Sequence, residues 1–246
     1  MIKSLGDFVI PAQAGIQLFK DALFPIHCAD CGQEGEWWCQ SCRQEPTNLA
    51  ESACYRCGRS NLDGRVCFNC QKHGAIAGVM AFFNYKIPAV ARLITDFKYH
   101  SVFEMSQLWQ KIITEEIWRL DFLFTGPLTI MPVPLHPRRE RERGFNQSLI
   151  LAELIYSQLK NTGKECLLDS QNLCRTRFTA QQAKLDRRAR QKNLRNAFCW
   201  NLDAVVPERI LLVDDVITSG ATARECARVL KQHGAKFVWV AALARG

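Results

Sequence analysis

The sequence predicts an α/β protein: a parallel sheet with helices on both faces, preceded by a small cysteine-rich zinc-ribbon module. Two observations lead to this fold class. Residues 208–244 run through a continuous apolar segment, an amphipathic helix and a second apolar segment, which is the pattern of a βαβ unit. Nearer the amino end, eight of the 12 cysteines form four CxxC pairs, and this spacing is typical of zinc ligands.

Three parts are expected along the chain. Its 246 residues are enough for one good-sized domain and a small module. The parts are an N-terminal helical segment, a double zinc-ribbon module and the α/β domain, at residues 1–27, 28–73 and 79–246 respectively.

The first part of the chain does not have the pattern of a membrane segment. Asp7, Pro11, Lys20 and Asp21 interrupt it. It therefore lacks the apolar run of a signal peptide and the roughly 20 apolar residues of a membrane span. We expect no membrane insertion and a cytoplasmic location, where a disulfide framework is unfavourable.

The cysteine-rich segment predicts two structural zinc sites. Its unit repeats, because "CADCG…CQSC" is followed 26 to 28 positions later by "CYRCG…CFNC". Four thiolates favour tetrahedral zinc, and a glycine after the second cysteine of each unit eases the tight turn. The alternatives are a disulfide-rich segment, which a reducing compartment opposes, and an iron–sulfur site, which the regular paired spacing disfavours.

Two pairings of the cysteines are compatible with this spacing. In the sequential pairing, which we favour, each half of the repeat holds one ion. In the crossed alternative the first CxxC pair joins the third and the second joins the fourth. The sequential ligand sets are Cys28, Cys31, Cys39 and Cys42 for one ion, and Cys54, Cys57, Cys67 and Cys70 for the other.

The positive charge is concentrated in one segment. The formal net charge is +8, and residues 175–195 contain eight Lys/Arg and one Asp, or +7. Residues 28–73 contain five basic and six acidic residues, or −1. Two sites of one Zn²⁺ and four thiolates would lower this module to about −5. A module of that charge is poorly suited to bind nucleic-acid phosphates by itself.

The expected elements of the α/β domain follow from periodicity and end signals. Asn146 is a candidate cap for one helix, and Gly234 is a candidate stop for another. The predicted strands are residues 79–85, 128–134, 208–215 and 236–244, and the predicted helical regions are residues 90–118, 147–160 and 222–234.

The segment "ILLVDDVITSGAT", residues 210–222, predicts a ligand site. A continuous apolar run suits a parallel strand buried on both faces, and ligands bind at the carboxyl ends of such strands. Asp214 and Asp215 end this run. They accept hydrogen bonds only, so they suit sugar hydroxyls such as those of ribose. The turn that follows enters a helix N-terminus, which favours a phosphate. Its residues are Thr218, Ser219, Gly220, Ala221 and Thr222.

This segment resembles the signature of type I phosphoribosyltransferases, which bind 5-phosphoribosyl 1-pyrophosphate (PRPP) with magnesium. Other stretches resemble the ComF family, and the resemblance covers roughly residues 24–246. It implies a phosphoribosyltransferase-like domain behind the zinc module, and a part in natural competence and the handling of single-stranded DNA. The matching stretches are "LITDFKYH" (93–100), "MPVPLHPRRERERGFNQS" (131–148) and the spaced set Arg175, Thr179, Gln182, Leu185, Arg190, Asn193, Ala197 and Phe198.

The resemblance also implies roles for basic residues. The loop that contains Arg143 lies on the pyrophosphate side, and residues 175–195 lie where the family has a flexible catalytic hood. Arg175 is expected to reach the pyrophosphate. Lys98 is a candidate to reach a phosphate, with a side chain that extends to solvent as the alternative. The other expected members of the two segments are His136, Arg138, Arg139 and Arg141 in the loop, and Thr179, Gln182, Arg190 and Asn193 in the hood.

Two functions from different classes remain open on the sequence. The first is a PRPP-liganded binding protein in DNA uptake, which binds single-stranded DNA through residues 175–195 and works with proteins of the competence machinery. The second is an active magnesium-dependent phosphoribosyltransferase acting on a base or amine. The sequence shows no residues that would read an acceptor, so turnover is left open. Phe178 is a candidate to stack on bases, whereas Phe198 is assigned to the core.

Overall fold

The computed structural model describes residues 25–45, 49–72, 74–99, 102–178 and 194–246. The predicted N-terminal helical segment falls almost entirely outside this part of the chain, as does most of the basic segment 175–195.

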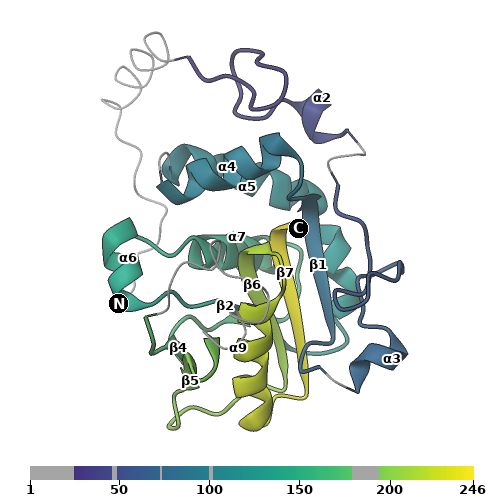
Figure 1. The fold of residues 1–246 in the computed structure, drawn as a ribbon, viewed down its shortest axis with the longest axis vertical. Helices are drawn as coiled ribbons and strands as arrows, with labels where there is room; N and C mark the ends of the chain where they lie inside the picture. Colours follow the sequence, from purple (N-terminus) through teal and green to yellow (C-terminus); the bar gives the residue numbers. More distant parts are fainter. Residues whose placement is uncertain (1–24, 46–48, 73, 100–101, 179–193) are drawn as a thin grey trace.

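The main sheet has five parallel strands in the order β1-β7-β6-β2-β3 (Figure 1). The last two strands of the chain, β6 and β7, therefore lie between the much earlier strands β1 and β2. The bounds are β1 Gly78–Asn84, β2 Leu128–Pro132, β3 Cys166–Leu168, β6 Arg209–Ile217 and β7 Phe237–Arg245.

Helices cover both faces of the sheet, as predicted. On one face lie α4 (Pro88–Tyr99), α5 (Val102–Glu116), the 3-10 helix η3 (Ile117–Leu123) and α7 (Gln147–Asn161). On the other lies α9 (Ala221–Gln232), beside an antiparallel hairpin of two short strands (Figure 1). The strands of the hairpin are β4 Leu173–Arg175 and β5 Phe198–Trp200.

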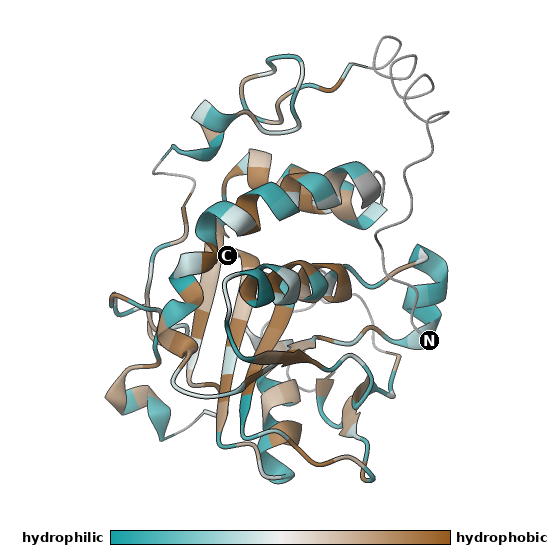
Figure 2. Cartoon of the chain, turned by 180° about the vertical axis from the view of Figure 1, so that it is seen from behind, coloured by the Kyte–Doolittle hydropathy of each residue, from teal (hydrophilic) through white to brown (hydrophobic). Residues whose placement is uncertain are grey.

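The apolar strands are explained by these two layers. In β6, Leu211 and Val213 belong to the core under α4, α5 and α7, whereas Ile210 and Leu212 belong to the core under α9. Because successive side chains of a strand point to opposite faces, a strand between two helical layers must be apolar at every position. Figure 2 shows the sheet strands as predominantly hydrophobic ribbon between helices of mixed character.

The predicted elements match the observed ones with shifts at their ends. Helix α7 begins at Gln147, and the Asn146 side chain accepts from the Ser148 N–H as a cap. Gly234, with φ of 114°, follows the end of α9. The predicted helical region 90–118 is divided into α4, α5 and the start of η3. Strand β6 continues two residues beyond its predicted end, to Ile217, and both aspartates lie near its carboxyl end.

The first zinc ribbon, which contains Cys28–Cys42, packs beside α5 and β1. The Arg43 guanidinium is buried and pairs with Glu115 of α5 at 2.6 Å. Trp38 is also buried and meets Phe83 of β1 edge to face, with ring centroids 4.7 Å apart. A buried aromatic pair and a partly buried ion pair fix this ribbon to the helical layer.

The second zinc ribbon, which contains Cys54–Cys70, covers the free edge of β1. The Val66 N–H donates to Ala77 O at 2.8 Å, and the Val79 N–H donates to Gly64 O at 3.0 Å. An unpaired strand edge would otherwise expose backbone groups. Arg245, at the end of β7, donates from Nη1 to Ala53 O at 2.9 Å, which joins the ribbon to the carboxyl side of the sheet.

Candidate functional site

A cavity of about 810 Å³ opens at the carboxyl ends of β2 and β6. It lies between the end of α4, the short helix α6 (Pro137–Arg143), the first turn of α7 and the start of α9. Parallel strands present their carboxyl ends at one edge of a sheet, so the loops after neighbouring strands converge there. The site predicted from the sequence is therefore in the position expected for a ligand in this fold.

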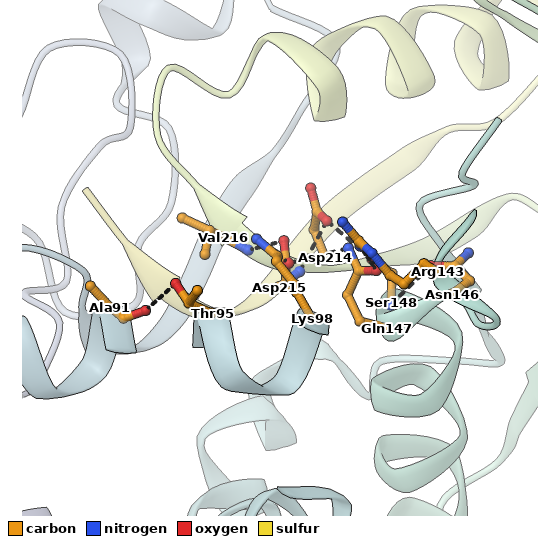
Figure 3. Close-up of polar contacts among 10 residues, drawn as sticks. All are labelled: Ala91, Thr95, Lys98, Arg143, Asn146, Gln147, Ser148, Asp214, Asp215 and Val216. Carbon is orange, nitrogen blue, oxygen red and sulfur yellow. Dashed lines mark hydrogen bonds and ion pairs between the residues drawn. The ribbon is translucent and has the colours of Figure 1, made fainter. Parts of the chain in front are cut away.

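Asp214 and Asp215 form the acidic floor of the cavity (Figure 3). Asp214 Oδ1 accepts from Ser148 Oγ at 3.1 Å and from the Asp215 N–H at 3.0 Å. Asp215 Oδ2 lies 2.6 Å from Lys98 Nζ and accepts from Gln147 Nε2 at 3.2 Å. The two carboxylates thus have different partners: Asp214 has neutral donors, whereas Asp215 has an ammonium group.

This difference determines the protonation of the pair. Burial and then the neighbouring Asp215 charge raise the pKa of Asp214 to about 7, against the opposing effects of the Asp215 N–H, Lys98 and Ser148. Burial alone would lower the pKa of Lys98, but the Asp215 carboxylate outweighs burial and raises it. Asp215 is therefore the carboxylate paired with Lys98, whereas Asp214 is divided near neutral pH between its neutral and its charged form.

The turn after β6 has the geometry of a helix N-terminus. Gly220 is the N-cap of α9 with φ of 66°, a left-handed conformation that glycine adopts without strain. Thr218 and Thr222 line the cavity. Ser219 O accepts from Arg224 Nη1 at 2.7 Å, which fixes the turn from the helix side. The first N–H groups of a helix have no partner within it and attract anions.

Basic side chains form the opposite wall. Arg139 and Arg143 of α6 and Arg175 of β4 all line the cavity. Arg143 donates to Gln147 Oε1 and lies 5.3 Å above the ring of Tyr99. The Arg175 side chain is buried, and burial followed by the positive charge of Arg139 lowers its pKa. The positive charges of Arg139 and Arg175 repel each other, and an anion bound between them would relieve this repulsion.

The structure brings together most, but not all, of the residues predicted for the site. Eight of them line one cavity: Lys98, Arg139, Arg143, Arg175, Asp214, Asp215, Thr218 and Thr222. Ser219, Gly220 and Ala221 form the adjoining turn and helix start. Lys98, expected near a phosphate, instead pairs with Asp215. Hood residues between Thr179 and Asn193 lie outside the described part of the chain.

The loop expected on the pyrophosphate side forms helix α6 and its flanks. His136 caps this helix, since its Nδ1 accepts from the Arg138 N–H at 3.1 Å. Arg138 pairs with Glu142 at 2.9 Å and is not among the residues that line the cavity. Phe198 is buried, as predicted. Phe178 is half-exposed, and the guanidiniums of Arg138 and Arg139 lie 4.7 and 5.5 Å from its ring centroid.

Four polar residues of the cavity were not singled out from the sequence, although the last three lie in stretches that carry the family resemblance: Tyr85, Tyr99, Gln147 and Ser148. A usable signal existed for the last two. They follow the Asn146 cap in the first turn of a helix that comes after a predicted parallel strand. The loop after that strand must meet the loop after β6 at the same edge of the sheet. The tyrosines follow no comparable pattern, since α4 and the end of β1 reach the site only through tertiary packing.

The cysteines form the two sequential sets that the repeat predicts. In each set the four sulfur atoms lie within 4.8 Å of one another. The halves share their backbone geometry: Gly32 and Gly58 have φ of 76° and 74°, and each donates its N–H to the carbonyl of the first cysteine of its set. The Cys39 N–H donates to Cys28 Sγ at 3.5 Å, which favours a thiolate. Four converging sulfurs in such turns suit tetrahedral zinc.

No helix in the described part of the chain is both long and apolar enough to cross a membrane.

Comparisons with known proteins agree with the cysteine module and extend over most of the chain. The model of the double zinc ribbon domain matches residues 19–71. A hypoxanthine-guanine phosphoribosyltransferase from Bacillus anthracis has a similar structure at a TM-score of 0.37 and 12% identity, covering 56% of this chain and 66% of that one.

Three relatives match across the zinc module and the α/β domain. DNA utilization protein YhgH of Escherichia coli K12 is 32% identical over 86% of this chain and 92% of its own length. Competence protein F of Haemophilus influenzae is 30% identical over 84% of this chain and 90% of its own length. Competence protein ComFC of Streptococcus pneumoniae is 26% identical over 84% of this chain and 87% of its own length. The chain therefore belongs to the ComF family, together with competence protein F and YhgH.

Proposed function

We propose that the cavity binds PRPP with Mg²⁺, and that the chain handles single-stranded DNA in natural competence. The observation that carries the PRPP proposal is the position of Asp214 and Asp215, between the helix-capping turn of α9 and a wall of arginines. Carboxylates accept from the vicinal ribose hydroxyls, the turn suits the 5-phosphate, and guanidiniums suit the pyrophosphate. The cavity volume of about 810 Å³ lies within the usual range for a small-molecule site.

The chemistry of the donor set fits magnesium. Mg²⁺ is usually held by one or two carboxylates together with substrate phosphates, and Asp214 and Asp215 supply the carboxylates here. Bound Mg²⁺ would neutralise charge on the pyrophosphate. Arg143 and Arg175 are the side chains that we assign to this part of the ligand. Lys98 balances Asp215 and could reach a phosphate only by leaving that carboxylate.

Titration calorimetry with PRPP and MgCl₂ tests the proposal. Asp214→Asn and Asp215→Asn keep the side-chain shape but replace a charged acceptor by a neutral amide. Hydrogen bonds to charged groups are worth roughly 1.5–3 kcal/mol, so each change should weaken PRPP binding about 10- to 100-fold. Glu208→Gln, just before the opposite end of β6, removes the same charge outside the cavity and serves as the control. Normal PRPP binding by both aspartate variants would refute the PRPP proposal.

Catalytic turnover is a separate question with its own measurement. Phosphoribosyl transfer releases pyrophosphate, and basic donors would stabilise its developing charge. The described cavity offers these donors, but it contains no group that we can assign to an acceptor. Pyrophosphate release, measured with a panel of bases and amines, distinguishes an enzyme from a PRPP-binding protein without turnover.

The DNA part of the proposal is supported by charge and by the relatives. Residues 175–195 carry +7. Arg175, the first of them, lines the cavity, and β5, which begins just after the last of them, pairs with β4. The relatives are named for competence and DNA utilization. Phe178 adds a half-exposed ring among guanidiniums at the start of the segment. We further propose a cytoplasmic location and contacts with other competence proteins.

A further inference from the structure

Two cysteines outside the zinc sets face each other across the β4–β5 hairpin. Cys174 and Cys199 are directly paired in the register of the two strands. Two residues further along the ladder in each direction, the opposed residues are hydrogen-bonded. The Thr176 N–H donates to Ala197 O at 2.9 Å on one side, and the Asn201 N–H donates to Asn172 O at 2.8 Å on the other. Because hydrogen-bonded pairs alternate along an antiparallel ladder, the cysteine pair is itself at a hydrogen-bonded position.

This register fits a disulfide. The Cα atoms of a hydrogen-bonded pair are about 5.5 Å apart, and both side chains lie on the same face. A disulfide spans Cα separations of roughly 4.4–6.8 Å. It also needs Cβ atoms about 3.5–4.5 Å apart, whereas opposed residues place them about 4.5–5.5 Å apart. The bond would therefore draw the strands slightly together, and a strained disulfide is easily reduced.

The pair is open to reagents, unlike the other cysteines without zinc-ligand spacing. Cys174 and Cys199 are exposed, whereas Cys166 and Cys226 are buried. The opposite face of the hairpin is anchored in the core. Its residues Leu173, Arg175, Phe198 and Trp200 are all buried. The hairpin thus presents two thiols outward on a fixed base.

The surroundings of Cys174 favour its thiol over its thiolate. Burial raises the pKa of the Cys174 thiol, and the charges of Cys199 and Asp169 raise it further. Cys174 Sγ also donates to Gln171 O at 3.2 Å, which holds the sulfur as a thiol. Since the thiolate is the reactive form, the raised pKa makes the reaction of Cys174 with oxidants slower at neutral pH.

We propose that Cys174 and Cys199 are a modification site that forms a reversible cross-strand disulfide, with a low-molecular-weight disulfide as the oxidant. The thiolate of one cysteine attacks the oxidant and expels one small thiol, leaving a mixed disulfide. The other cysteine loses its proton and attacks the protein sulfur, expelling the second small thiol. The two protein thiols lose two electrons and two protons, and the oxidant is reduced to two thiols.

The cross-link would act on the cavity through the strand backbone. Arg175, which lines the cavity, follows Cys174, and Phe198, which lies under the Arg175 guanidinium at 5.4 Å, precedes Cys199. A bond between the strands fixes the separation of these two residues. Oxidation is therefore expected to reduce the mobility of the wall that carries Arg175, without removing any charge from it.

The experiment uses the zinc-loaded full chain in mixtures of reduced and oxidised glutathione. After acid quenching and alkylation, peptide mass spectrometry should find Cys174 joined to Cys199, with a mass about 2 Da below that of the two free peptides. Dithiothreitol should reverse the link. In Cys199→Ser, Cys174 should instead carry one glutathione, and Cys174→Ser should behave reciprocally. Both substitutions are at exposed positions, so the fold should be kept.

Zinc measured in the same samples separates this reaction from damage to the ribbons. A cross-link that forms only as zinc is released would overturn the proposal. So would cysteines that stay reduced, or that each carry a glutathione without joining, across the whole range of mixtures.

Discussion

The ring of Tyr55 lies against Gly220. A Cβ atom at position 220 would meet two carbons of this ring at 3.5 and 3.6 Å. Tyr55 lies between Cys54 and Cys57 in the second zinc ribbon, and Gly220 caps the helix at the cavity. Arg245 holds the same part of the ribbon through Ala53 O and Cys54 O. The second ribbon is thus an outer wall of the turn that we assign to the ribose 5-phosphate.

Tyr55→Ala should therefore weaken PRPP binding although Tyr55 does not line the cavity. Loss of the ring leaves the glycine turn free to move, and we expect an effect of about 3- to 10-fold, or roughly 0.7–1.4 kcal/mol. Calorimetry with PRPP and MgCl₂ measures it, and zinc content shows that the ribbon is intact. Tyr55→Phe keeps the ring and is the matched control. Unchanged binding in the alanine variant would mean that the turn is fixed by its own contacts, such as Arg224 to Ser219 O.

Loss of one zinc site should have different effects in the two ribbons. Metal-replete protein should contain about two zinc equivalents, and structural zinc supplies folding energy on the order of 10 kcal/mol. Cys70→Ser should unfold the second ribbon and expose the β1 edge and the Gly220 turn, so PRPP binding should fall. Cys42→Ser should affect mainly the contacts of the first ribbon with α5. Equal losses of PRPP binding in the two variants would contradict this division.

Stability should depend on pH through Asp214. The folded protein raises the pKa of this carboxyl from 3.8 to about 7, so between these values it holds a proton that the unfolded chain releases. The cost of Asp214 to folding grows as pH rises from about 4 and levels off above about 7. Asp214→Asn removes this cost, and its gain in Tm over the native chain should be larger at pH 8 than at pH 5.

Asp203→Asn is the control for this measurement, because it removes one carboxylate from the exposed turn after β5. A gain in Tm that does not change between pH 5 and pH 8 would show that Asp214 is charged throughout this range.

Single-stranded DNA binding should be strongly salt-dependent. Each phosphate contact contributes about 0.7 to the slope of log affinity against log salt. Replacing Arg187, Arg188 and Lys192 by Ala should flatten this slope by about 2. Replacing Arg59, Arg65 and Lys72 of the second ribbon removes the same charge from the zinc module and should change it little. If the ribbon variant loses the slope instead, the DNA site belongs to the zinc module.

The features that could be predicted from the sequence are those formed by residues close together in the chain. The unit of β6, α9 and β7 is contiguous, and each zinc set lies within 17 residues or fewer of chain, so periodicity and spacing are sufficient. Strand β3 and the β4–β5 hairpin have three residues per strand, too few for a pattern. The pairing of Lys98 with Asp215 and the contact of Tyr55 with Gly220 join distant segments, and these depend on how the layers pack.

The strand order also sets the order in which the chain can fold. Strand β7 lies between β1 and β6, and β6 pairs with β2, so the middle of the sheet is synthesised last. The ribbons need only nearby cysteines and can close around metal while the ribosome is still translating. Strands β1 and β2 leave the ribosome before their neighbours β7 and β6, and at least about 80 further residues must be synthesised before these can pair with them. At the usual rates of translation this takes several seconds. During that time the apolar faces of β1 and β2 are open to chaperones. A chain truncated before β7 would keep its metal modules but leave β1 without its neighbour in the sheet.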